Sequence, residues 1–173
     1  MKEIIAYTDG SAVVAGKNKG RGGFGVYFSD LEGEPKAFSL GFKQAKTGQM
    51  EVMALLHAII HVPKKNKEPV KLIVYSDSEY VVKTFTENRL QKWVANDWIN
   101  SSGEVKNKDL WKKILKSLEK RRFLILKMRH IRSHQVEKEK DPKKKELLKQ
   151  DPHIQGNMMA DWLADYKRHK KLL

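Results

Sequence analysis

The order of the hydrophobic patterns along the chain constrains its fold more than any other feature of the sequence. Three short apolar segments, at residues 4–8, about 24–28 and near 37–43, are separated by turn residues. Such a series is typical of antiparallel strands joined by turns. The first segment ends at Asp9-Gly10, which is read as a turn, and the glycine-rich stretch from residue 16 to 25 is read as a loop.

The patterns after residue 48 predict helices that alternate with buried strands. Between residues 49 and 62 the apolar side chains recur at helical spacing; they are Val52, Leu55, Leu56, Ile59 and Ile60. Residues 70–76 form a near-continuous apolar run, which is typical of a buried parallel strand. The remaining patterns predict a helix at 78–86, a helix at 108–121, a strand at 123–131 and a last helix at about 157–170. Asp141-Pro142 is a cap-plus-proline pair that predicts a further short helix.

The charge of the chain indicates a polyanionic partner. Its 173 residues include 35 Lys and Arg against 21 Asp and Glu, a net charge of +14. Residues 83–129 hold 13 basic and 5 acidic residues, whereas residues 135–152 are nearly balanced. Zero cysteines exclude disulfides, and no apolar stretch approaches the length of a membrane helix. We therefore expect a cytoplasmic protein in a reducing compartment, with no membrane partner.

Two strand-like segments end in the same way, with a hydroxyl residue followed by an aspartate: Thr8-Asp9 and Ser76-Asp77. If the two strands are parallel neighbours, Asp9 and Asp77 face each other at the carboxyl end of the sheet. Two anions placed so close favour a divalent cation between them, and oxygen ligands favour Mg²⁺ or Mn²⁺. The alternative is that Asp9 caps a turn and Asp77 caps a helix.

Several motifs together resemble those of type 1 ribonuclease H, in the same order and with similar spacing over about residues 3–167. They are Thr8-Asp9-Gly10-Ser11, Met50-Glu51-Val52-Met53-Ala54, Ser76-Asp77-Ser78-Glu79-Tyr80-Val81, His134 and Gly156-Asn157-Met158-Met159-Ala160-Asp161-Trp162-Leu163-Ala164. The resemblance implies an α/β fold with a five-stranded mixed sheet, three antiparallel strands followed by two parallel ones, flanked by helices. It also implies one catalytic domain over residues 1–173, with a basic protrusion at about 88–107 and a charged insert at about 135–152.

The resemblance further implies an endoribonuclease that hydrolyses the RNA strand of RNA–DNA hybrids and leaves 3′-hydroxyl and 5′-phosphate ends. The metal-binding carboxylates would be Asp9, Glu51, Asp77 and Asp161, holding two Mg²⁺ ions with Mn²⁺ as a substitute. His134 would transfer a proton or assist product release, for which a histidine pKa near neutrality is suited. The alternative for His134 is an ordinary exposed loop residue. No organic cofactor is implied, and we expect a monomer that acts as a stand-alone enzyme.

The residues expected to contact nucleic acid come from the motifs, from the basic protrusion and from the predicted helix at 108–121 that follows it. They are Gly10, Ser11, Thr47, Gln49, Ser78, Glu79, Lys92, Trp93, Trp98, Lys112, Lys113 and Asn157. Cations interleaved with aromatic rings suit phosphates and sugars or bases, and Gly10 would let the backbone approach the RNA strand. The alternative is that the tryptophans are core residues that hold the protrusion together.

The chain departs from the family pattern at three places. The segment Lys46-Thr47-Gly48-Gln49 stands where Thr-Asn-Asn is usual, and Glu79 stands where glutamine is common. From His134 to Asp161 is 27 positions, far more than the usual dozen or so. Two other functions remain open from the sequence: a nucleic-acid-binding module without catalysis, and DNA strand transfer on the same scaffold.

Overall fold

The structure is a computed structural model that describes residues 1–64, 66 and 68–173. Its strands are β1 (Lys2–Ala12), β2 (Gly22–Leu31), β3 (Glu34–Phe42), β4 (Val70–Ser76), β5 (Ile99–Asn100), β6 (Gly103–Glu104) and β7 (Leu124–His130). Its helices are α1 (Thr47–Ile60), α2 (Glu79–Thr86), α3 (Arg89–Ala95), α4 (Lys108–Glu119), α5 (Gln135–Lys138), α6 (Pro142–Gln150), α7 (Pro152–Ala164) and the 3₁₀ helix η1 (Tyr166–Arg168).

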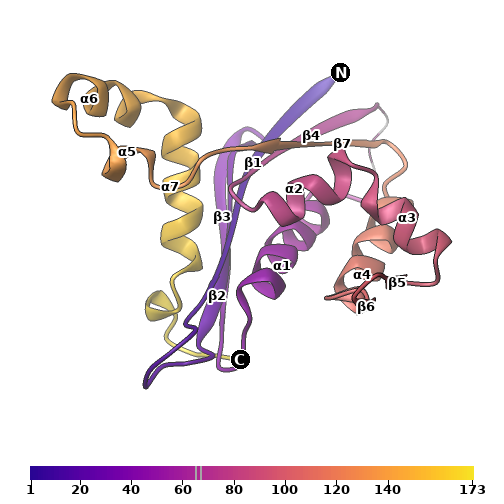
Figure 1. Cartoon of the computed structure of the whole chain (residues 1–173). Helices are drawn as coiled ribbons and strands as arrows, with labels where there is room; N and C mark the ends of the chain where they lie inside the picture. The colour runs from indigo at the N-terminus through magenta and orange to yellow at the C-terminus, as the bar shows by residue number, and fades with distance from the viewer. Residues whose placement is uncertain (65, 67) are drawn as a thin grey trace.

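Five strands form one mixed sheet in the order β3-β2-β1-β4-β7. β2 is antiparallel to both β1 and β3, and β4 is parallel to both β1 and β7. The expected sheet of three antiparallel strands followed by two parallel strands is therefore confirmed. In Figure 1, α7 covers one face of the sheet, while α1 and α2 lie on the other face.

Helix α1 packs its apolar stripe against the sheet to form the main core. Val52, Leu55, Leu56 and Ile59 are buried, as are strand residues that include Ile4, Ala6, Leu72 and Val74. Burial of this kind stabilises the fold by about 1.5–3 kcal/mol for each large aliphatic side chain. One predicted core residue, Ile60, is instead 38% exposed, because it ends the helix at the edge of the stripe.

The prediction that Asp9-Gly10 and the following glycines form a turn and a loop was wrong for part of this stretch. β1 continues to Ala12, and Gly22, Gly23 and Gly25 pair with it as β2. The reason is close packing by α7: a Cβ at Gly25 would lie 2.3 Å from the carbonyl oxygen of Ala160. Glycine serves here to let a helix backbone approach a strand, and not to form a loop.

The last helix begins and ends earlier than predicted. α7 starts at Pro152, where the Asp151 side chain accepts hydrogen bonds from the backbone N–H groups of His153 and Ile154. It ends at Ala164, and Asp165 then caps the short helix η1. The same Asp-Pro arrangement starts α6, so the prediction drawn from Asp141-Pro142 is confirmed.

The segments that contain the predicted basic protrusion and the predicted charged insert lie at opposite sides of the molecule. α3, the β5–β6 hairpin and α4 lie on one side, whereas α5 and α6 lie beside the start of α7 (Figure 1). Among the described residues, no helix has the length and apolar character needed to cross a membrane.

Candidate active site

Asp9 and Asp77 lie where the pairing between the parallel strands β1 and β4 ends, although β1 itself continues to Ala12. The register pairs Thr8 of β1 with Ser76 of β4, so each aspartate directly follows a paired residue. Side chains at matching positions of parallel neighbours project from the same face of the sheet. Asp9 is only 8% exposed and Asp77 is half-buried. The structure thus brings the two carboxylates to one place, as the strand-end argument requires.

Helix α7 adds a third carboxylate, that of Asp161, whose charge acts on both Asp9 and Asp77. Burial, followed by the charges of Asp77 and Asp161, raises the pKa of Asp9 well above its usual range. Burial and then Asp161 also raise the pKa of Asp77. Three carboxylates therefore repel one another in a partly desolvated place, and a bound cation would relieve this repulsion.

Glu51 reaches this region from α1, on the opposite face of the sheet from α7. A Cβ at Gly10 would lie 2.2 Å from the backbone nitrogen of Glu51, so only glycine lets α1 sit this close to β1. The Glu51 Oε2 atom accepts a 2.7 Å hydrogen bond from the Ser78 hydroxyl. Burial raises the pKa of Glu51, the Ser78 hydrogen bond opposes this rise, and the charge of Asp77 adds to it.

This packing gives Gly10 a structural role in addition to the predicted approach to an RNA strand. Its Cα faces the α1 backbone, and its N–H donates to the Asp9 carboxylate at 2.8 Å. Gly10 therefore positions Glu51 and Asp9 relative to each other.

The four carboxylates are not already assembled as a metal cage. Within residues 1–64, 66 and 68–173, no three Asp, Glu or His side chains stand in an arrangement that would hold a metal ion. Their chemistry nevertheless fits a hard divalent cation, because every donor is a carboxylate oxygen. The raised pKa values of Asp9 and Asp77 point the same way, since a nearby positive charge favours the ionised form.

His134 lies beside this cluster. It shares a small cavity of about 20 Å³, enough for one water molecule, with Asp77, Asn157 and Asp161. The His134 backbone is left-handed, with φ of 53°, and its half-exposed ring lies 4.0 Å from the carboxylate of Glu137. The structure therefore places His134 next to Asp77 and Asp161, although the long insert separates His134 from Asp161 in the sequence.

Asn157 supplies an uncommitted polar atom in the same cavity. The residue is 6% exposed, and its Oδ1 atom is one of two buried side-chain atoms in the described part of the chain that lack a hydrogen-bond partner. A buried carbonyl oxygen without a donor carries a free-energy cost of about 1–3 kcal/mol, which a donor from water or a ligand would remove.

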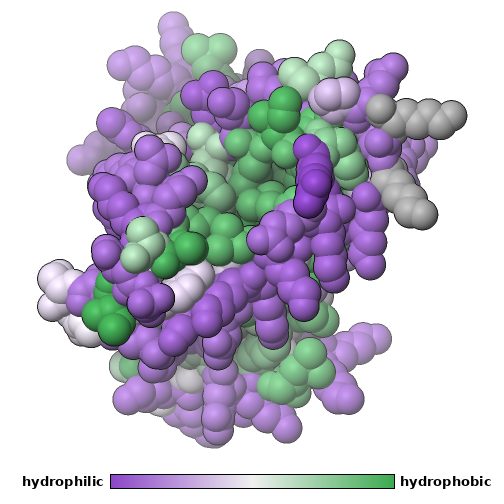
Figure 2. All heavy atoms as spheres, turned by 90° about the vertical axis from the view of Figure 1, so that its right-hand side faces the viewer, coloured by the Kyte–Doolittle hydropathy of each residue, from purple (hydrophilic) through white to green (hydrophobic). Residues whose placement is uncertain are grey.

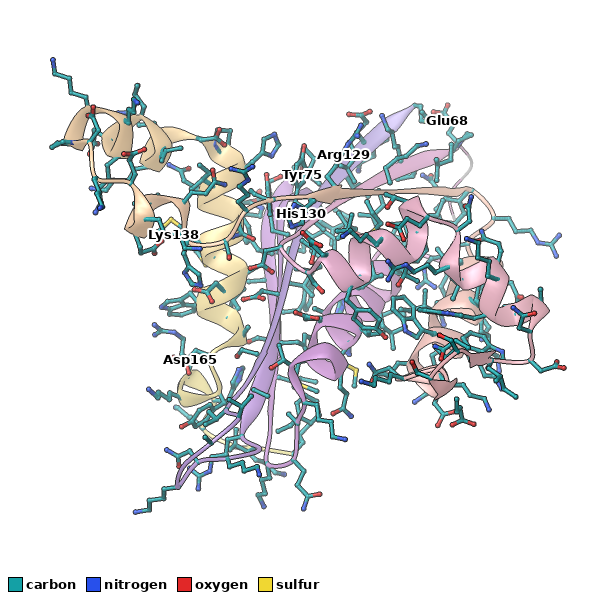
Figure 3. All side chains as sticks on the ribbon, viewed as in Figure 1. Glu68, Tyr75, Arg129, His130, Lys138 and Asp165 are labelled. Atoms are coloured by element: carbon teal, nitrogen blue, oxygen red, sulfur yellow. The ribbon has the colours of Figure 1, made fainter. Side chains whose placement is uncertain are left out.

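The sequence pattern does not distinguish His130 from the other histidines, yet the structure places it at the site. His130 ends β7, pairs in register with Ser76, and has its Nε2 atom 3.3 Å from the carbonyl oxygen of Asp77. The strand-end rule that identified Asp77 could also have identified His130, because β7 is the next parallel strand. In Figure 3, His130 lies near the centre of the molecule, close to Tyr75.

Some of the other residues predicted to contact nucleic acid make internal hydrogen bonds, whereas others face solvent. Ser78 is buried and caps α2 in addition to holding Glu51, and Glu79 is exposed and paired with Lys83. The Ser11 hydroxyl donates to the carbonyl oxygen of Ala164. Thr47 and Gln49 line a separate surface hollow with residues of the β1–β2 loop, so they face solvent at the start of α1.

The tryptophans of the basic protrusion and of α4 are mostly internal. Trp111 is fully buried and donates to the Tyr80 hydroxyl at 2.8 Å, and the rings of Trp93 and Trp111 are 5.8 Å apart. Trp98 is 8% exposed, so its ring is largely withdrawn from an incoming nucleic acid. For Trp98 the geometry favours the alternative of a core aromatic over the predicted nucleic-acid contact.

The lysines of the protrusion and of α4, in contrast, face solvent. Lys92, Lys112 and Lys113 are exposed, and the Lys112 ammonium lies 5.7 Å from the centre of the Trp98 ring. The side of the molecule that carries α3 and α4 is hydrophilic around its rim, with apolar side chains gathered nearer its middle (Figure 2). Cations on a firmly packed support suit the neutralisation of phosphates.

Comparison with known proteins agrees with this arrangement. A model of the RNase H family matches residues 1–168. The ribonuclease H of Caldicellulosiruptor saccharolyticus is 38% identical over 121 residues, which cover 69% of this chain and 77% of that protein. The solution structure of the PFV RNase H domain is similar with a TM-score of 0.66 at 24% identity, covering 93% of this chain and 91% of that one. LC11-RNase H1, solved in complex with an RNA/DNA hybrid, has a TM-score of 0.59 at 22% identity and covers 94% of both chains.

The fold and the family match are those of a nuclease. The chain belongs to the type 1 ribonuclease H family.

Proposed function

We propose that this enzyme hydrolyses the RNA strand of RNA–DNA hybrids by a two-metal-ion mechanism and leaves 3′-hydroxyl and 5′-phosphate ends. The observation that carries the proposal is that Asp9, Asp77 and Asp161 lie close together where β1 and β4 stop pairing, with Glu51 beside Asp77. Membership of the ribonuclease H family supports it, as does the hybrid bound by LC11-RNase H1.

Asp9, Glu51, Asp77 and Asp161 are the residues that would hold the metal ions, Mg²⁺ with Mn²⁺ as a substitute. Such ions lower the pKa of an attacking water and stabilise the charge on the leaving oxygen. Because the described carboxylates do not form a finished cage, a substrate phosphate would complete the ligand set. We therefore expect metal affinity to rise when substrate is present.

The other side chains of the site position groups and move protons. Ser78 orients the Glu51 carboxylate through its hydroxyl. His134, which opens onto the same cavity as Asp161, would deliver a proton to the leaving 3′ oxygen or assist the departure of the product. Asn157 presents a free acceptor oxygen for a water or a ribose hydroxyl.

The hybrid would be held outside the carboxylates by residues at the surface. Lys92, Lys112 and Lys113 would bind phosphates of the DNA strand, while Ser11 and Gln49 would lie along the RNA strand. We propose that the chain acts as a monomeric catalytic domain without an organic cofactor. A cytoplasmic location is consistent with the lack of cysteine in the sequence.

The decisive experiment compares matched duplexes of DNA, of RNA and of hybrid, with and without Mg²⁺ or Mn²⁺. We expect cleavage of the RNA strand in the hybrid alone, dependent on metal, and lost in Asp9→Asn and Asp77→Asn with folding intact. Hybrid binding without any metal-dependent product would indicate a binding module. Joining of DNA strands would indicate strand transfer, and wild-type rates in either variant would remove the proposed mechanism.

A further inference from the structure

The cavity beside His134 continues along α7 into a second hollow that the mechanism above does not use. The second hollow has a volume of about 480 Å³ and shares Glu137, Met158 and Asp161 with the first. Its walls are the end of β1, at Ser11–Val13, and the last turn of α7 together with η1. A ligand that occupies the carboxylate site can therefore extend directly into it.

Trp162 lines this hollow with an indole ring that is partly exposed to solvent. It directly follows Asp161 and is 49% exposed, whereas Trp98 and Trp111 are buried. The Arg168 guanidinium lies 4.0 Å from the centre of the Trp162 ring, within the range of a cation–π contact. A half-exposed indole backed by a guanidinium presents a flat, polarised surface of the kind on which sugars and bases rest.

The charge next to the hollow suits a phosphate backbone. Residues 167–171 read Lys-Arg-His-Lys-Lys, and all four cations are exposed. This segment is held in place, because the His169 ring bonds to the carbonyl oxygen of Leu163 and the backbone of Leu173 pairs with Gly41 and Lys43 of the β3 end. The β1–β2 loop adds the exposed cations Lys17, Lys19 and Arg21.

Carboxylates also line the hollow, and they limit where an anion can lie. Asp161 belongs to the catalytic cluster, Asp165 is engaged by the N–H of Lys167 at 3.0 Å, and Glu137 lies at the His134 side. Asp165 marks the lower end of α7 in Figure 3, well away from Lys138 on α5. Phosphates would therefore lie toward Lys167 and Arg168, with a sugar or base against Trp162.

We propose that this hollow, the Trp162–Arg168 subsite, binds the RNA strand where it leaves the carboxylates on the side of the β1 end. The inference rests on the proposed function, since it takes the scissile phosphate to lie at Asp9 and Asp161. Trp162 contacts a ribose or an unpaired base, and Arg168 and Lys167 neutralise the adjacent phosphates. The subsite thus favours hybrids with RNA on that side of the cleavage position.

The test measures hybrid binding in an Asp77→Asn background, which keeps the substrate intact. Trp162→Ala and Arg168→Ala should each weaken binding by about tenfold. Arg168→Ala should also lower the slope of log K against log salt by about 1, while Trp162→Ala leaves the slope unchanged. Leu147→Ala, an exposed residue of α6 outside this hollow, and Lys2→Ala, at the far end of β1, are the matched controls and should bind as the background does.

Shortening the RNA strand locates the contact. Removing the RNA nucleotides that would lie in the Trp162–Arg168 subsite should cost as much affinity as Trp162→Ala does. With this shortened RNA strand, Trp162→Ala should have no further effect on affinity. Removing nucleotides on the other side should leave the Trp162→Ala effect at its full size. Quenching of tryptophan fluorescence by the hybrid, lost in Trp162→Phe, would report the contact directly.

Two outcomes would overturn the subsite. One is unchanged binding in both Trp162→Ala and Arg168→Ala; the other is an equal loss of affinity for duplex DNA of the same sequence. Cleavage of the hybrid by the wild-type protein, which keeps Asp77, is measured in parallel. If the wild-type protein cuts hybrids normally while the Trp162→Ala and Arg168→Ala variants bind hybrids normally, the subsite is wrong and the nuclease proposal stands. If it cuts no hybrid, the proposed function fails whatever the variants show.

Discussion

The Tyr7 hydroxyl lies 2.9 Å from Nδ1 of His153, and this contact joins the central strand β1 to the first turn of α7. The Tyr75 ring stacks on the same imidazole, with ring centres 4.3 Å apart. Tyr7 and Asp9 are two residues apart on β1 and therefore share one face of the sheet. Because His153 and Asp161 both belong to α7, the Tyr7–His153 contact helps to set the position of Asp161 relative to Asp9.

Replacing Tyr7 with phenylalanine should lower the free energy of unfolding by about 1 kcal/mol, the usual net worth of one buried hydrogen bond. Burial raises the pKa of Tyr7 from 10.0 to about 12, so the folded state favours the neutral hydroxyl. The neutral Tyr7 hydroxyl therefore makes its full contribution to the free energy of unfolding below pH 10, and this contribution is lost as the pH rises toward 12. Urea unfolding at several pH values should show that Tyr7→Phe removes this alkaline loss. Tyr27→Phe, at the paired position of β2, is the control, and an alkaline loss in Tyr7→Phe equal to that of the wild type would exclude the role.

Asp9→Asn should stabilise the metal-free protein while it lowers the rate of cleavage more than about 100-fold. The folded state raises the pKa of Asp9, so the stability linked to its protonated form is present at low pH and lost as the pH rises. At neutral pH the ionised carboxylate therefore destabilises the fold, and the neutral amide removes that cost. Thermal unfolding at pH 7 without metal should show a higher Tm for Asp9→Asn than for the wild type.

Addition of Mg²⁺ to the same two proteins supplies the converse measurement. The ion should raise the Tm of the wild type more than that of Asp9→Asn, because only a ligand that binds the folded state stabilises it. An equal rise in both proteins would place the metal away from Asp9.

Arg121→Met should lower the free energy of unfolding by about 3 kcal/mol. The Arg121 side chain is 2% exposed, and its guanidinium donates to the carbonyl oxygens of Ile60, Val62 and Ser117. It therefore links the carboxyl ends of α1 and α4, and its loss leaves buried carbonyls without donors. Arg121→Lys, which keeps the charge but not the planar fork, should recover part of the loss in a urea titration. A loss below about 0.5 kcal/mol in Arg121→Met would contradict this role.

Reversing the charges of Lys92, Lys112 and Lys113 together should flatten the dependence of hybrid affinity on salt. Each lost phosphate contact lowers the slope of log K against log salt by about 0.9, so the triple variant should lose about 2.7. Lys143, Lys144 and Lys145 of α6 provide a control with the same change in charge. An equal change in slope for both triple variants would show that the effect is general and that the hybrid does not lie along Lys92, Lys112 and Lys113.

Much of the fold could be predicted from local sequence patterns. The run at residues 70–76 matches β4 in full, and the stripe from Val52 to Ile59 is the buried face of α1. Side-chain alternation in strands and the helical period are properties of neighbouring residues, so they can be seen in the sequence. Asp9 and Asp77 could be located for the same reason, since each directly follows such a run.

The errors occurred where distant contacts override local preference. Gly22–Gly25 has the composition of a loop but forms a strand, because α7 needs glycine beneath it. Trp98 sits among cations as a surface aromatic would, yet it is buried inside the protrusion. Neither result is visible in the residues that flank these positions.

The sequence by itself determined the order of strands and helices, the carboxylate chemistry and the positive charge, because each depends on residue type and short-range spacing. Only the tertiary structure decided that α1 and α7 approach from opposite faces to bring Glu51 and Asp161 to the two aspartates. It alone revealed the Tyr7–His153–Tyr75 contacts and the hollow beside Trp162. Burial, pKa and shape depend on which distant residues meet, and that is settled by the packing of helices onto the sheet.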